Sequence, residues 1–434
     1  MPITRRSLLG AAAPAFLRGA QPPNFLLLIT DQQTHFALSC AGNRWLNTPA
    51  MDAIAARGTR FASAYCPYPV CSPSRSSIFS GAMPHVTGVM VNGRPIRAGL
   101  PTLGEVFSRA GYQTAYGGKW HLPRSFDGMT GFTKIIGGSA MGADMDAPLA
   151  TATARWLEGR PKEPFFLVAS FMNPHDVCEW IRQHKGTREH PKLAGYPPAP
   201  ANLENDPQEP ECIQYHRQQG YDRMSEAVGI AAQWRAQEFR QYLHDYYRLV
   251  EQVDRDVGRV LDALSAAGLA EKTVVAFCSD HGEGMGGHRW VQKASLYEES
   301  ARVPLILAGP GIPARKVNSK LVSLEDLMPT FCRMAGLRVP ESSMGTGLFK
   351  ESRTQVVSEL RYGDETREGR MLRTARYKYI RFRSGRNPEQ LFDLSKDPGE
   401  TRNLAARSES REPLQRHRTL LDQWMKQTRD HFPG

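Results

Sequence analysis

The run Phe25-Leu-Leu-Leu-Ile29, which ends at Thr30-Asp31-Gln32, is the stretch that decides the fold. The run is short and wholly apolar, and it does not alternate between apolar and polar residues. This pattern is typical of a strand buried on both faces. Such strands occur in parallel sheets that helices cover on both sides. In these sheets ligands bind beyond the carboxyl ends of the strands, so the polar residues after Ile29 are candidates for a site.

Similar runs recur along the chain. Strands are predicted at 113–116, 165–171 and 273–278, and helices at 102–111 and 236–267, the latter with apolar residues at three- and four-residue spacing. Ionisable residues follow each strand, and because carboxyl ends of parallel strands meet at one edge, we expect these residues to share a site. They are Asp31 after the first strand, Lys119 and His121 after the second, His175 after the third, and Asp280 and His281 after the fourth.

Alternating strands and helices predict the α/β class, with a mostly parallel central sheet flanked by helices. The 434 residues exceed what one core normally fills, so we expect a large domain with an appendage. We assign residues 21–350 to the catalytic domain, with an insertion at about 177–235 that is polar and lacks clear periodicity. Residues 351–434 are predicted to form a smaller C-terminal α+β subdomain, with short strands and a terminal helix at 408–427.

Composition narrows the function classes. With 41% hydrophobic and 23% charged residues, the chain is an ordinary globular protein and not collagen-like, coiled-coil or disordered. No apolar run reaches the roughly 18 residues of a membrane span, so stable membrane insertion is not expected. Lys and Arg total 55 against 44 for Asp and Glu, a net charge of +11 that favours anionic partners. The excess forms no basic arm, and nucleic-acid motifs are lacking, which argues against a nucleic-acid partner. A small sulfated or phosphorylated ester is the other candidate, and a mildly basic surface without functional meaning is the alternative.

The first twenty residues predict export. Thr4-Arg5-Arg6-Ser7-Leu8-Leu9 precedes a short Ala-rich apolar stretch, a pattern similar to a twin-arginine signal, with an ordinary secretory signal as the alternative. We therefore expect a periplasmic or secreted protein. Seven cysteines show no CxxC pair and no metal-ligand spacing, and their pairing cannot be deduced from sequence.

The segment Cys71-Ser-Pro-Ser-Arg75, which continues to Gly81, predicts a helix with Cys71 at its N-terminus. Pro73 suits the first turn and Gly81 suits the end. A helix N-terminus favours an anion, and Arg75 lies one turn on, on the same face as Cys71. A buried thiol beside a surface arginine is the alternative interpretation of these residues alone.

This segment resembles the CxPxR signature of the type I sulfatases. The resemblance extends along the mature chain through Gly118-Lys-Trp-His-Leu122, Ser279-Asp-His-Gly-Glu283 and Lys293-Ala-Ser-Leu-Tyr297, and on to Leu391-Phe-Asp-Leu near the end. It implies an alkaline-phosphatase-like α/β fold and a sulfuric ester hydrolase.

The resemblance also implies a mechanism. A separate maturation enzyme would convert Cys71 to formylglycine, whose hydrated aldehyde carries two hydroxyl groups on one carbon. One hydroxyl would attack sulfur and expel the alcohol of the ester, which gives a covalent formylglycine-sulfate intermediate. The other, deprotonated by His121, would then expel sulfate. Lys119 and Lys293 correspond to sulfate-holding lysines, His175 to the residue at the bridging oxygen, and Arg75 to the residue that orients formylglycine.

Four positions match the metal ligands of the family, namely Asp31, Gln32, Asp280 and His281. The commonest pattern has Asp at the position of Gln32 and Asn at that of His281. Calcium, the expected cation, prefers oxygen ligands, whereas an imidazole suits manganese, iron or zinc, so the identity of the metal stays open.

The sequence does not decide which ester is the substrate. A sulfated carbohydrate is preferred for a basic exported chain. A phosphonate monoester or phosphodiester is the first alternative, since sulfuryl and phosphoryl groups are both tetrahedral, and choline sulfate is the second. An inactive protein that binds sulfated glycans is a third alternative, but the chain retains every residue that catalysis requires.

Overall fold

The computed structural model describes residues 22–122, 131–138, 141–183, 195–219, 223–349 and 353–432. The predicted export signal lies outside these residues. Within them, eight strands form a central sheet in the order β4-β3-β5-β1-β6-β7-β2-β8. All pairings are parallel except those of β7, which runs against β6 and β2. The strands are β1 (Asn24–Asp31), β2 (Gly58–Tyr65), β3 (Gln113–Gly118), β4 (Thr133–Ile136), β5 (Phe165–Pro174), β6 (Thr273–Ser279), β7 (Leu305–Ala308) and β8 (Lys316–Ser323).

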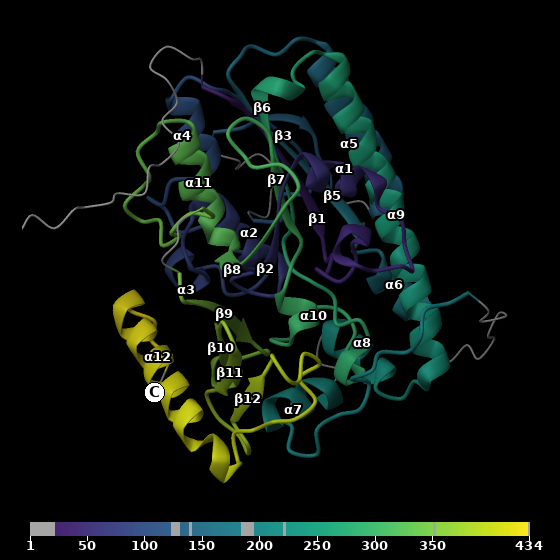
Figure 1. The fold of residues 1–434 in the computed structure, drawn as a ribbon, viewed down its shortest axis with the longest axis vertical. Coiled ribbons are helices and arrows are strands. Elements are labelled where there is room, and N and C mark those ends of the chain that lie inside the picture. The colour runs from purple at the N-terminus through teal and green to yellow at the C-terminus, as the bar shows by residue number, and fades with distance from the viewer. Residues whose placement is uncertain are drawn as a thin grey trace, which may run out of the picture.

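Helices cover both faces of this sheet (Figure 1), because successive side chains of each buried strand point to opposite faces. Phe25, Leu27 and Ile29 of β1 enter one core, which includes side chains of α2 (Cys71–Ser80), α4 (Leu103–Arg109) and α11 (Leu327–Met334). Leu26 and Leu28 enter the other, with α1 (Pro49–Arg57), α5 (Gly142–Glu158) and α9 (Ala236–Ala266). The α/β class predicted from the apolar run is therefore confirmed.

The sequence predicted the ends of two helices to within about two residues. The helix expected at 102–111 is α4, which opens with a capping box between Thr102 and Glu105. The long helix expected at 236–267 is α9, of 31 residues. The strands β2, β4 and β8 and the helix α5 were not predicted. β8 begins with exposed residues at the sheet edge, and α5 contains Pro148, so neither shows the usual pattern.

The predicted C-terminal α+β unit is a second sheet, antiparallel, in the order β12-β11-β10-β9. Its strands are β9 (Gln355–Arg361), β10 (Glu368–Thr374), β11 (Tyr377–Phe382) and β12 (Glu389–Asp393), and α12 (Arg411–Thr428) packs on it. Figure 1 shows this unit at one end of the molecule, below the central sheet.

The segment 177–235 is more regular than the sequence suggested. Its described part contains α6 (Val177–Gln183), α7 (Glu211–Gln219) and α8 (Arg223–Ala231). Apolar residues of α6 and α8 pack with Tyr242 and Tyr246 of α9. These helices are too short for clear periodicity, and their packing on α9 supplies the stability that their sequences do not reveal.

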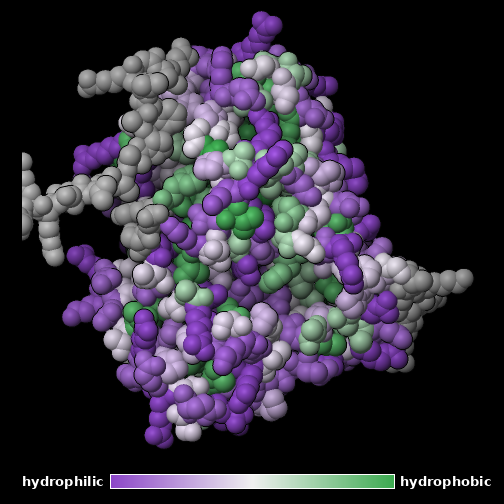
Figure 2. Space-filling model, in the orientation of Figure 1, coloured by the Kyte–Doolittle hydropathy of each residue, from purple (hydrophilic) through white to green (hydrophobic). Residues whose placement is uncertain are grey.

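The surface is predominantly hydrophilic on the face shown in Figure 2, with hydrophobic side chains scattered in small patches. Among the described residues, no helix combines the length and apolar character that crossing a bilayer requires. All seven cysteines lie in the described part of the chain and are free thiols.

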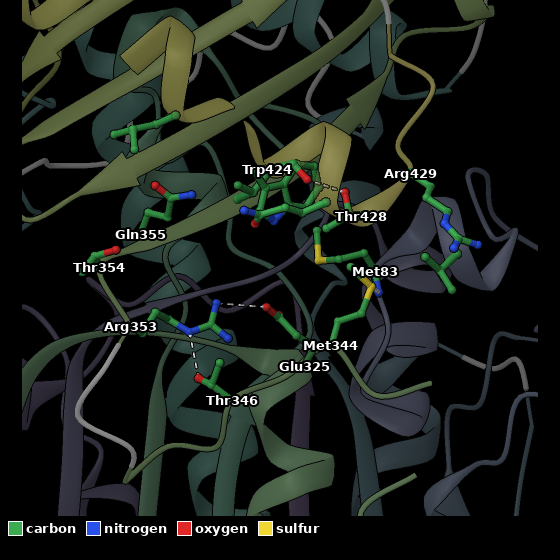
Figure 3. A pocket seen from close by; sticks show the side chains of 14 residues that line it. Met83, Glu325, Met344, Thr346, Arg353, Thr354, Gln355, Trp424, Thr428 and Arg429 are labelled. Atoms are coloured by element: carbon green, nitrogen blue, oxygen red, sulfur yellow. Dashed lines mark hydrogen bonds and ion pairs between the residues drawn. The ribbon is translucent and has the colours of Figure 1, made fainter. Parts of the chain in front are cut away.

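A cavity of about 780 Å³ near α3 (Pro84–Thr87) is lined by residues of both units. Figure 3 shows Met83, Met344 and Trp424 facing it, together with Arg353, which pairs with Glu325. None of the predicted catalytic or metal-binding residues lines this cavity.

Candidate active site

The carboxyl ends of four strands converge as the sequence predicts. Asp31 ends β1 and is paired in register with Pro174 of β5, while Thr30 is paired with Ser279 of β6. These pairings bring Asp31 beside Asp280, which follows β6. Lys119 follows β3, whose last residue pairs with Ser170 of β5. A single edge of the sheet therefore supplies most of the predicted site.

Cys71 is the first residue of α2, and all ten residues of this helix are buried. Gly81 ends it with φ +70, a left-handed conformation in which an added Cβ would meet Met328 and Ser343. The N-terminus of α2 has fewer free N–H groups for an anion than most helices have. Pro73 has no N–H, and the backbone amide of Ser72 donates to Oδ1 of Asn92. Side chains therefore provide most of the positive potential.

The thiol of Cys71 lies among charged groups. Its Sγ is 3.2 Å from Nζ of Lys293, 3.8 Å from Nζ of Lys119 and 3.2 Å from Nε2 of His281. Burial and the Asp31 carboxylate oppose ionisation, but the two lysines outweigh them and hold the pKa of Cys71 well below its usual range. The position of the Cys71 side chain thus stabilises negative charge.

Arg75 joins the two carboxylates at the strand ends. Its Nε is 2.7 Å from Oδ2 of Asp280, and its Nη2 is 3.0 Å from Oδ2 of Asp31. Its Nη1 donates to the carbonyl of Lys119 and to Oγ of Ser170, both at 2.8 Å. A planar guanidinium can make these contacts at once, and a lysine cannot. Arg75 is therefore a buried framework for the site, and its role in orienting formylglycine, which the family resemblance implies, stays a prediction.

Three residues form a donor set suited to a divalent cation. Ligand atoms of Asp31, Asp280 and His281, together with that of Cys71, lie within 4.8 Å of one another, and all four side chains are buried. Nδ1 of His281 contacts the carbonyl oxygen of Gly282 at 2.9 Å, which leaves Nε2 directed at the carboxylates. Burial and the charge of Asp31 raise the pKa of Asp280 to about 6, so a cation here would relieve repulsion between the two acids. The residues fit a bound metal.

Gln32, the fourth predicted ligand, adopts φ +70 directly after β1. Its side-chain oxygen Oε1 accepts from Nζ of Lys293 at 3.1 Å, and its Nε2 donates to Oε2 of Glu283 at 2.7 Å. Its backbone amide donates to Oδ1 of Asp280 at 3.2 Å. The amide oxygen thus faces the lysine that also contacts Cys71.

The two predicted catalytic histidines differ in their surroundings. Burial, followed by Lys293 and Lys119, lowers the pKa of His175 well below its usual range, so its imidazole is neutral. The backbone carbonyl of His121 accepts from the hydroxyl of Ser72, and its Nδ1 is buried without a hydrogen-bond partner. Among the described residues, no hydrogen bond joins the His121 ring to Cys71, so its role as a base stays a prediction.

Sequence reasoning missed three residues that contact the site. Glu283 and Cys178 both contact the Gln32 amide, and Ser170 contacts Arg75. Glu283 belongs to the motif Ser279-Asp-His-Gly-Glu283, which also contains Asp280 and His281. Its proximity to these two residues in the sequence could have indicated that it lies at the site. Cys178 and Ser170 offered none, because their proximity arises from the pairing of β1 with β5 and from α6.

The buried Cys71 thiol lies between two lysines, beside a cluster of carboxylates and an imidazole at the carboxyl edge of an α/β sheet. This arrangement is typical of a hydrolase of anionic esters. The family model described as Sulfatase matches residues 23–337, and that of N-sulphoglucosamine sulphohydrolase, C-terminal, matches residues 286–427. The chain belongs to the sulfatase family and is a sulfuric ester hydrolase on the alkaline-phosphatase-like fold.

Relatives and solved structures agree with this assignment. The chain is 35% identical to a Delta 4,5-hexuronate-2-O-sulfatase of Bacteroides thetaiotaomicron, over 98% of this chain and 92% of that protein. The structure of a 2-O GAG sulfatase matches with a TM-score of 0.86 at 31% identity, covering 94% of this chain and 93% of the other. The phosphonate monoester hydrolase of Agrobacterium radiobacter shares the fold, with a TM-score of 0.76 at 22% identity over 94% and 96% of the two chains.

Proposed function

We propose that this protein hydrolyses the sulfate ester of a sulfated carbohydrate, and that a 2-O-sulfated hexuronate is the substrate class. The observation that carries the proposal is the position of Cys71, whose Sγ lies 3.2 Å from Lys293 and within 3.8 Å of Lys119 and Asp31. The substrate class is supported by the names of two relatives, the hexuronate-2-O-sulfatase and the 2-O GAG sulfatase.

Cys71 is the residue proposed to be converted to formylglycine, whose hydrated aldehyde supplies the nucleophilic hydroxyl. Lys119 and Lys293 bind the sulfuryl oxygens and stabilise the charge that develops on them. Arg75 holds Asp31 and Asp280 in place through its guanidinium. The neutral imidazole of His175 is suited to a hydrogen bond with the bridging oxygen, and His121 is assigned as the base.

Asp31, Gln32, Asp280 and His281 are proposed to hold one divalent cation. A cation held there would lower the pKa of the nucleophilic hydroxyl and would offset charge on the sulfuryl group. Two carboxylates and an amide oxygen favour calcium, whereas the imidazole also suits manganese or zinc. Residues 1–20 are proposed as the export signal that delivers the protein to the periplasm or the exterior.

A substrate panel tests the proposal. The protein is produced with a formylglycine-generating enzyme, and rates are compared on a 2-O-sulfated unsaturated hexuronate disaccharide, a 6-O-sulfated amino sugar, choline sulfate and an aryl phosphonate monoester. We expect kcat/KM for the first to exceed the others by about 100-fold or more, since a site built around polar substrate groups rejects esters that lack them. A dominant rate on the phosphonate would overturn the sulfatase proposal, and a dominant rate on choline sulfate would overturn the carbohydrate.

The Cys71→Ala variant is the control for the chemistry. We expect no hydrolysis of any ester in the panel, whereas Cys40→Ala, which changes a thiol away from the site, keeps the parent rate. Mass spectrometry of the peptide that contains Cys71 reports the conversion to formylglycine. Turnover by Cys71→Ala at the parent rate would contradict the assignment.

A further inference from the structure

A buried carboxylate that the sequence did not assign lies behind the Gln32 amide. Glu283 follows Asp280 and His281 in the chain, and its side chain is wholly inaccessible to solvent. Its Oε1 accepts from the backbone amide of Gln292 and from the hydroxyl of Tyr242, and its Oε2 accepts from Nε2 of Gln32 at 2.7 Å. The backbone N–H of Gln292 can only donate, so Oε1 must be an acceptor.

The orientation of the Gln32 side chain follows from this arrangement. The ammonium of Lys293 can only donate, so the group that Gln32 turns toward Lys293 is its oxygen and the group that it turns toward Glu283 is its NH₂. The amide oxygen then points the other way, where it accepts from Nζ of Lys293 at 3.1 Å. The NH₂ donates to Oε2 of Glu283, so one orientation of the amide satisfies both neighbours.

We propose that Glu283 is a positioning residue that fixes the amide of Gln32 with its oxygen toward Lys293 and the cation site. This inference rests on the proposed function of Gln32 as a ligand. It also gives a physical reason for glutamine at a position where the commonest family pattern has Asp. A carboxylate at position 32 would place its negative charge against that of Glu283 in a buried site, whereas an amide satisfies both neighbours.

The substitution Glu283→Gln tests the proposal without changing volume. Because Gln292 and Tyr242 still donate to the group at position 283, the introduced amide keeps its oxygen toward them and turns its NH₂ toward Gln32. Gln32 must then reverse and present its own NH₂ to Lys293 and the cation. Substitution of a group behind a metal ligand typically costs 10–100-fold in metal affinity, and we expect calcium binding to weaken by about that factor.

Exchanging the two side-chain types separates positioning from a merely structural role. In the double variant Gln32→Glu with Glu283→Gln, the amide at position 283 donates to a carboxylate at position 32, whose other oxygen faces the site. We expect this variant to bind calcium within about threefold of the parent and more tightly than Glu283→Gln alone, since coupled neighbours show non-additive effects. The exchange conserves the net charge and the number of atoms, so it is the decisive variant.

The measurement is isothermal calorimetry with calcium, repeated with manganese, on the protein that retains the Cys71 thiol, so it needs neither maturation nor substrate. Glu299→Gln is the matched control, because Glu299 is a neighbouring carboxylate that accepts from Asn202 and contacts no predicted ligand side chain. Parent affinity in Glu283→Gln, or an exchanged pair that binds no better than that variant, would overturn the inference. Either result would leave the substrate panel unaffected, so failure here and failure of the proposed function are distinguishable.

Discussion

The guanidinium of Arg75 and the carboxylate of Asp280 form a fully buried ion pair, with Nε 2.7 Å from Oδ2 and neither side chain exposed. The same guanidinium binds Asp31 at 3.0 Å. One side chain from α2 therefore connects the ends of β1 and β6. The helix that begins with Cys71 is thereby held against the cluster of Asp31, Asp280 and His281.

Removing Arg75 should destabilise the fold before any effect on chemistry is considered. Arg75→Met leaves buried Asp280 without its arginine partner, while Asp31 keeps Lys119 at 2.7 Å. Breaking a buried ion pair in this way typically costs about 3–5 kcal/mol of unfolding free energy. Urea unfolding in the absence of substrate and metal measures the loss. Arg57→Met, which removes an exposed ion pair with Glu271, should cost less than about 1 kcal/mol. Equal costs for the two variants would refute a structural role for Arg75.

Lys293 should contribute mainly to catalysis. Its Nζ is 3.2 Å from Cys71 Sγ, and the residue is only 5% exposed, so its charge acts at the reacting group with little screening. We expect Lys293→Met to lower kcat/KM on the best sulfate ester by about 10²–10³-fold, the usual effect of losing one preorganised donor. The exposed Lys272→Met serves as the control. An unchanged kcat/KM in Lys293→Met would remove this lysine from the site.

Lys378 of β11 should couple the two units. Its buried Nζ lies 2.9 Å from Glu298, 2.8 Å from Glu400 and 3.0 Å from the carbonyl oxygen of Leu296, in the segment that carries Lys293. Lys378→Met removes the cation that pairs with Glu400, whereas Glu298 keeps Arg302 at 3.5 Å. We expect this broken buried pair to cost about 3–5 kcal/mol in unfolding free energy.

Adding Glu400→Gln to this variant should recover part of the loss, because one unpaired charge is then removed. Lys396→Met, at an exposed position, is the control for a lysine substitution in this unit. A double variant that is less stable than Lys378→Met alone would contradict this account of the pairing.

His85 should make the stability depend on pH. It connects α3 to the C-terminal unit through Glu359, with Nδ1 2.5 Å from Oε1. Burial lowers the pKa of His85, but the carboxylates of Glu359 and Asp430 outweigh it and raise the pKa above its usual value. Asp430 also pairs with Arg370 in the same cluster.

A raised pKa in the folded state means that protonated His85 stabilises the fold. The contribution is complete below about pH 6.5, where the unfolded imidazole is also protonated, and is lost as pH rises through the folded pKa. The difference in unfolding midpoint between the parent and His85→Gln should therefore shrink from about pH 6 to about pH 9. A difference that widens over this range would contradict the sign.

The sequence by itself determined the class of fold and the edge of the sheet at which most of the predicted site residues lie. An unbroken apolar run such as Phe25 to Ile29 can be buried on both faces only in a covered sheet, so the ionisable residues after Ile29 and after the later strands had to meet at one edge. The helix that begins at Cys71 followed from Pro73 and Gly81, whose backbone preferences are local.

Only the tertiary structure decided how the side chains are connected. Arg75 reaches the carboxylate of Asp280 across 205 residues of sequence, and Glu283 reaches the amide of Gln32 across 251. Such contacts depend on strand register and on the crossing of α2 over the sheet, and no local propensity encodes them. The orientation of the Gln32 amide is set by neighbours that the chain brings together only when it folds.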